Sequence, residues 1–140
     1  MKTIKTISIL LCLVFFNQMT AQHKMTPAEK ENAANKVQIY TSTERDNIQM
    51  WFHERVATME LTKEQEEQYY RDVDYYIVKI SRLNNKDKGL TEEEVLAGME
   101  DYVAKINTEV QPILSKEQYQ IHLGSFEILI KSFTNRLKEE

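Results

Sequence analysis

A five-residue pattern that starts a helix occurs twice in this chain, as LTKEQ at residues 61–65 and as LSKEQ at residues 114–118. In both copies a hydroxyl side chain stands three positions before a glutamine. In such a capping box the hydroxyl accepts a hydrogen bond from the first helical turn, and the glutamine bonds back to the N-cap backbone. The two copies predict two helix starts, made by Leu61, Thr62 and Gln65 and by Leu114, Ser115 and Gln118. Ordinary helix N-termini with no further role would also explain the two copies.

Composition and periodicity predict an all-α fold. The 140 residues include only three glycines and two prolines, and apolar residues recur at spacings of three and four, as on one face of a helix. We expect four long helices in hairpins. The first covers residues 26–58, with a bend near Ser42 as an open alternative, and the others cover 62–83, 91–109 and 115 to near the C-terminus. Residues 84–89, rich in asparagine and ending in glycine, are expected to form a loop.

The first residues have the pattern of a secretory signal peptide. Lys2 and Lys5 precede an apolar run at residues 7–16, and Ala21 supplies a small residue before the expected cleavage site. The run of ten residues is shorter than the roughly 20 needed to cross a bilayer, so no stable membrane anchor is expected after cleavage. The sequence therefore predicts a signal peptide at 1–21, a single helical domain at 22–140, and export from the cytoplasm.

Cleavage would leave an acidic chain without cysteine. The single cysteine, Cys12, lies in the apolar run, so the mature domain has no thiol or disulfide chemistry. Loss of Lys2 and Lys5 would leave 16 basic against 22 acidic residues, a net charge of about −6. This charge disfavours strong binding to nucleic acid.

The chain offers no recognisable catalytic residues, and we predict no enzyme activity, no cofactor and no metal. His23, His53 and His122 have no metal-ligand spacing, and glycine-rich phosphate loops and serine elbows are absent from the sequence. His122 lies at the edge of a predicted core face and is interpreted as a packing residue. One metal alternative stays open: cleavage before Ala21 would create an Ala-Gln-His terminus able to chelate copper or nickel.

Two of the predicted helices carry a second, amphiphilic stripe opposite their core face. An apolar stripe flanked by basic residues favours a dimer interface or a surface for other chains, although single exposed apolar residues are normal. The candidate client- or partner-binding residues are Arg71, Tyr75, Val78 and Arg82 on the helix at 62–83, and Ile121, Ile128 and Lys131 on the last helix.

A signal peptide, a cysteine-free helical body and the two L-[TS]-x-x-Q starts at 61–65 and 114–118 together resemble the Spy/CpxP-like LTXXQ-motif family of periplasmic proteins. The resemblance implies a thin, cradle-shaped antiparallel homodimer with a concave surface, acting in envelope stress. Spy-like members are ATP-independent chaperones, and CpxP-like members also bind a sensor kinase. This chain departs from the family in Ser115, which replaces threonine, and in its acidic charge, since the family's cradle is typically basic.

The leading hypothesis is a periplasmic, ATP-independent holdase that binds unfolded or aggregation-prone envelope proteins as a homodimer. A second hypothesis is an interaction protein that docks on a sensor or another periplasmic partner. A third is a purely structural helical dimer in which the stripes are consumed by the interface. A metal-binding stress sensor comes last, because histidine is scarce and cysteine is absent from the mature chain.

Overall fold

The computed structural model describes residues 24–138, and it confirms an all-α fold over that range. Isolated backbone pairing of Lys36 with Asn85 is the nearest approach to a strand within residues 24–138. The predicted signal peptide at 1–21 lies outside the described residues. The helices are α1 (Pro27–Asn35), α2 (Ser42–Ala57), α3 (Lys63–Ser81), α4 (Glu92–Val110) and α5 (Lys116–Leu137), with short 3₁₀ turns η1 (Lys86–Lys88) and η2 (Gln111–Ile113).

Each of these five α-helices begins with a complete capping box. The predicted boxes at Thr62 with Gln65 and at Ser115 with Gln118 are confirmed, because both reciprocal hydrogen bonds are present in each. Three further boxes start the remaining helices: Thr26 with Glu29, Thr41 with Glu44, and Thr91 with Glu94. Local sequence therefore sets where every one of these helices starts.

The prediction of one continuous helix over residues 26–58 is wrong. The chain leaves helical conformation at Lys36 and begins a new helix after Thr41, whose hydroxyl accepts from the backbone N–H of Glu44 at 3.2 Å. Lys36 is extended and pairs with Asn85, and Tyr40 offers its carbonyl oxygen to the Arg45 guanidinium at 3.1 Å. These contacts replace the helical hydrogen bonds that the segment gives up. The predicted bend is thus a complete break of the helix.

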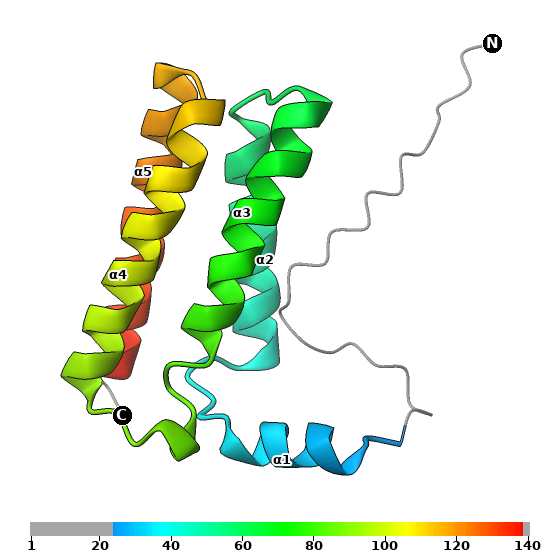
Figure 1. The fold of residues 1–140 in the computed structure, drawn as a ribbon, viewed down its shortest axis with the longest axis vertical. Coiled ribbons are helices and arrows are strands. Elements are labelled where there is room, and N and C mark those ends of the chain that lie inside the picture. Colours follow the sequence, from blue (N-terminus) through cyan, green and yellow to red (C-terminus); the bar gives the residue numbers. More distant parts are fainter. Residues whose placement is uncertain (1–23, 139–140) are drawn as a thin grey trace.

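Helices α2 to α5 pack in a ring around one core. Helix α3 packs most extensively on α4, α4 also contacts α5, and α5 contacts α2. Figure 1 shows α3 and α4 as the nearer pair, with α2 behind α3 and α5 behind α4, and with α1 running crosswise at the lower end. Helices α3 and α5 consequently occupy opposite corners of the bundle.

Apolar side chains from α2 to α5 form the core. Phe52 of α2 meets Phe126 of α5 edge to face, with 5.8 Å between ring centroids. Val73 of α3 and Ile106 of α4 are fully buried. The remaining buried apolar residues of the cluster are Val56, Met59, Tyr69, Tyr70, Met99, Val103 and Val110. Burial of such side chains contributes about 1.5–3 kcal/mol each, which makes this core the main source of stability.

At the upper end of the bundle, each glutamine of the repeated pattern also hydrogen-bonds to the segment that precedes the other helix. The Gln65 Nε2 group donates to the carbonyl oxygen of Ile113 at 2.8 Å and to Gln118 Oε1 at 3.3 Å. Gln118 Nε2 donates to the carbonyl oxygen of Met59 at 3.0 Å. Each amide thus caps its own helix with its oxygen and secures the loop before the other helix with its nitrogen. A glutamate could perform only the first task, because an ionised carboxylate has no donor.

We expect Gln118→Glu to destabilise the fold by about 2 kcal/mol, because the carboxylate still caps Ser115 but leaves the partly buried Met59 carbonyl without its donor. Chemical denaturation followed by circular dichroism measures the loss. The matched control is Glu94→Gln, which keeps a capping box that serves its own helix alone and should change stability by less than about 0.5 kcal/mol. Equal effects of the two substitutions would contradict the role assigned to the Gln118 amide nitrogen.

Candidate functional site

The predicted stripe residues are mostly accessible. Tyr75 of α3 is 58% exposed and Ile128 of α5 is 53% exposed, and both are among the exposed large hydrophobic residues of the described chain. Arg71, Arg82 and Lys131 are exposed, whereas Val78 and Ile121 are half-buried. Ile121 packs against the core, so it lies at the margin of its stripe.

The structure does not bring the two stripes together. Helices α3 and α5 lie at opposite corners of the bundle, and Tyr75 and Ile128 are exposed on these helices. Within one copy of the chain, Tyr75 and Ile128 therefore belong to separate surfaces. A single concave surface that combines both stripes is not formed by one chain.

Tyr75 instead belongs to a group of aromatic and basic side chains that spans α3 and α4. We call this group the tyrosine–lysine surface, and it comprises Tyr75, Tyr76, Lys79, Tyr102 and Lys105. The Tyr75 and Tyr76 rings meet edge to face at 4.9 Å, and Tyr102 lies 6.2 Å from Tyr76 between centroids. Lys79 Nζ lies 4.4 Å from the Tyr75 centroid, and Lys105 Nζ lies 5.1 Å from that of Tyr102. These are cation–π distances.

Both lysines of the tyrosine–lysine surface have neighbours that further favour the charged form. A hydrogen bond with Tyr75 raises the pKa of Lys79 above its usual value, and one with Asp101 at 2.6 Å raises the pKa of Lys105. The stripe predicted from the sequence includes Tyr75 but neither Tyr76 nor Tyr102. The spacing of Tyr75 and Lys79 by about one helical turn could have predicted their contact, but Tyr102 joins them only through the packing of α4 on α3.

His122 is a structural residue, as predicted. It is fully buried, it accepts from or donates to Tyr69 Oη through Nδ1 at 2.9 Å, and its Nε2 lies 2.8 Å from Asn107 Oδ1. Since an amide oxygen only accepts, Nε2 carries the proton and Nδ1 accepts from the tyrosine hydroxyl. Burial lowers the pKa of His122 to about 4, so the ring is neutral at physiological pH. Among residues 24–138 no cluster of three or more metal-ligating side chains is placed to hold an ion.

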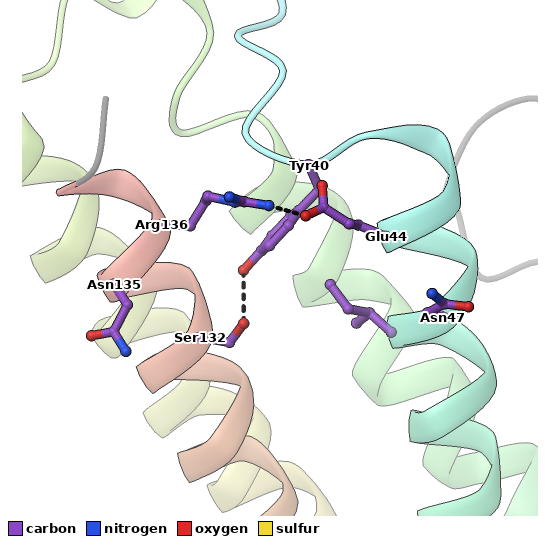
Figure 2. Close-up of a pocket in the computed structure, with 7 residues that line it drawn as sticks. Tyr40, Glu44, Asn47, Ser132, Asn135 and Arg136 are labelled. Carbon is purple, nitrogen blue, oxygen red and sulfur yellow. Dashed lines mark hydrogen bonds and ion pairs between the residues drawn. The ribbon is translucent and has the colours of Figure 1, made fainter.

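A shallow pocket of about 380 Å³ lies where the start of α2 meets the end of α5 (Figure 2). Arg136 forms an ion pair with Glu44, and its guanidinium lies 5.8 Å from the Tyr40 ring centroid. The Tyr40 hydroxyl hydrogen-bonds to Ser132 Oγ at 3.2 Å. These side chains engage one another across the pocket, so they fasten the residues before α2 to α5.

Comparison with family models, with characterised proteins and with solved structures found no match to this chain. No helix within residues 24–138 combines the length and apolar character that a membrane span requires. The candidate site therefore rests on the geometry of the tyrosine–lysine surface and of the α5 stripe.

Asp74 of α3 is an uncompensated acid beside the core. Its Oδ1 atom is buried and has no hydrogen-bond partner among the described residues, and burial raises the pKa of its carboxyl to about 6. A carboxyl whose pKa is raised in the folded state destabilises the fold when it ionises, because the unfolded chain ionises it more easily. The contribution of Asp74 is therefore most favourable below about pH 4 and is lost as pH rises through about 6.

We expect Asp74→Asn to raise the unfolding temperature at pH 7, because the substitution removes the buried charge, and the gain should disappear below about pH 4. Thermal unfolding across this pH range measures the difference. Asp72→Asn is the control, since the Asp72 carboxylate already accepts hydrogen bonds from Gln68 Nε2 at 2.9 and 3.0 Å. A stability difference between wild type and Asp74→Asn that does not change with pH would disprove the assignment.

Proposed function

We propose that this protein is an exported, periplasmic, ATP-independent holdase that binds unfolded or aggregation-prone proteins. The observation that carries the proposal is the exposure of Tyr75, 58% accessible on a surface that it shares with two lysines and two further tyrosines. Export is proposed from the signal-peptide pattern in the sequence.

The chemistry of the tyrosine–lysine surface suits weak and general binding of extended chains. Tyrosine offers a large apolar ring at little conformational cost and a hydroxyl that can hydrogen-bond. Apolar area of a client that becomes buried on the rings contributes about 25 cal/mol per Å². Lys79 and Lys105 favour acidic segments of a client without demanding one sequence. A holdase that binds the unfolded state of a client more tightly than the folded state keeps the unfolded client in solution by mass action, and no ATP is required.

We also propose that two copies of the chain form a homodimer, and that the cradle-like assembly arises from this dimer. In a two-fold dimer the same patch of each copy meets itself. The α5 stripe suits this contact, because Ile128 is flanked by Glu127 and Lys131, whose opposite charges can face each other across an antiparallel pair. A dimer through α5 would leave the tyrosine–lysine surface accessible on both copies, since α3 lies at the opposite corner.

The holdase proposal is tested by light scattering of a chemically denatured client as it refolds, at several ratios of the protein and without ATP. We expect wild type to suppress aggregation and Tyr75→Ser to lose most of that activity. Met50→Ser is the matched control, because Met50 is 59% exposed on α2 and lies outside both stripes. If wild type has no effect at severalfold excess, the holdase proposal fails and docking on one dedicated partner becomes the explanation.

The dimer is tested by light scattering coupled to size-exclusion chromatography. We expect Ile128→Ser to shift the protein to the monomer mass, because it replaces the apolar centre of the proposed contact, while Tyr75→Ser keeps the dimer mass. A wild type that elutes as a monomer at all concentrations would contradict the dimer without bearing on client binding.

A further inference from the structure

A second, larger cavity of about 410 Å³ lies at the lower end of the bundle, between the helices and the segment that joins α1 to α2. Its walls are mainly apolar, and they come from the joining segment, from the first turns of α2, from the C-terminal part of α3, from α4 and from the C-terminal half of α5. Representative lining residues are Val37, Ile39, Ile48, Ile80, Ile130 and Phe133. A volume of this size lies within the roughly 300–1,000 Å³ typical of small-molecule pockets.

The break between α1 and α2 creates this cavity. Residues 36–41 cross the end of the bundle as an extended roof, which is fixed at one side by the pairing of Lys36 with Asn85 and at the other by the hydrogen bond from Tyr40 to Ser132. A continuous helix would have carried this segment away from the bundle. The roof instead covers apolar side chains of α3, α4 and α5 at the edge of the core.

The charged groups of the cavity wall are positive. Lys36 and Arg45 line it, and no carboxylate is found among its described lining residues. Arg82 lies close enough that, after burial and the charge of Arg45, its charge also lowers the pKa of Lys36. An anionic head group placed beside Lys36 and Arg45 would interact favourably with both of their charges. Guanidinium groups also match the geometry of carboxylate and phosphate oxygens.

We infer that this cavity binds a single-chain anionic amphiphile, with its alkyl chain among the apolar walls and its head group at Lys36 and Arg45. The shared chemistry is one alkyl chain that ends in a carboxylate, as in a fatty acid, or in a phosphate. The volume of about 410 Å³ lies in the lower part of the range typical of small-molecule pockets, which favours a ligand with one alkyl chain.

The test titrates dodecanoate, below its micelle concentration, into protein with ¹³C-labelled isoleucine methyl groups. The chain carries its own internal control, because five described isoleucines line the cavity and four do not. We expect saturable shifts at Ile39, Ile48, Ile77, Ile80 and Ile130, and constant signals at Ile106, Ile113, Ile121 and Ile128. Shifts spread over both sets, or no saturable shift in either, would overturn the inference.

The head group is tested on the unaltered protein with ligands of equal chain length. Dodecanoate should bind at least tenfold more tightly than dodecanol, and dodecyltrimethylammonium should bind more weakly still, because its charge repels Lys36 and Arg45. Dodecyl phosphate is titrated beside dodecanoate, and the tighter of the two assigns the head group. Equal affinity for the anionic, neutral and cationic ligands would overturn the assigned charge recognition.

A double variant, Lys36→Gln with Arg45→Gln, should reduce the affinity for dodecanoate about tenfold and leave that for dodecanol nearly unchanged. The matched control is Lys30→Gln with Lys88→Gln, which removes two exposed charges that do not line the cavity. Unchanged affinity of a folded Lys36→Gln, Arg45→Gln variant for dodecanoate would overturn the head-group site. None of these measurements involves a client protein, so their failure is distinguishable from failure of the holdase proposal.

Discussion

The glutamine amides of residues 65 and 118 join the upper end of the bundle, and much of the arrangement depends on their ability to accept and donate at once. Each oxygen satisfies the N-cap backbone of its own helix, and each nitrogen bonds to the loop that precedes the other helix. The two helix starts are therefore positioned relative to each other by three hydrogen bonds from the two amide nitrogens, to the carbonyl oxygens of Ile113 and Met59 and to Gln118 Oε1. Below them Tyr69 and His122, seven residues after each cap, meet across the core.

This geometry determines which surfaces the chain presents. Since α3 and α5 face each other across the core from opposite corners of the bundle, their outer faces point away from each other, and the two amphiphilic stripes lie on separate surfaces. The surfaces also differ in chemistry, because that on α3 and α4 is aromatic and basic, whereas that on α5 is aliphatic with charges of both signs. Two surfaces of different chemistry can serve a client and a second copy of the chain without competition.

Local signals made the helix starts predictable, because a capping box is complete within four residues. The same logic applied to Thr41 and Glu44 would have located the break before α2, but the helix-forming residues on both sides favoured a continuous helix. The loop at 84–89 was equally predictable from its glycine, and Gly89 does adopt the left-handed conformation, with φ of 58°. The contact of Tyr102 with Tyr76 and the cavity beneath residues 36–41 depend on packing between distant segments, which periodicity alone does not specify.

Few contacts attach α1 and the segment after it to the bundle, and this affects how fast the segment can open. Helix α1 has no buried residue, and the segment after it is tied to the bundle by one backbone pairing and a few side-chain contacts. Opening of such a segment exposes the walls of the cavity but leaves the core between α2 and α5 buried, so it costs less free energy than global unfolding. The roof can therefore lift while α2 to α5 stay packed, and the exchange rate of any molecule in the cavity is set by this local opening rather than by the stability of the fold.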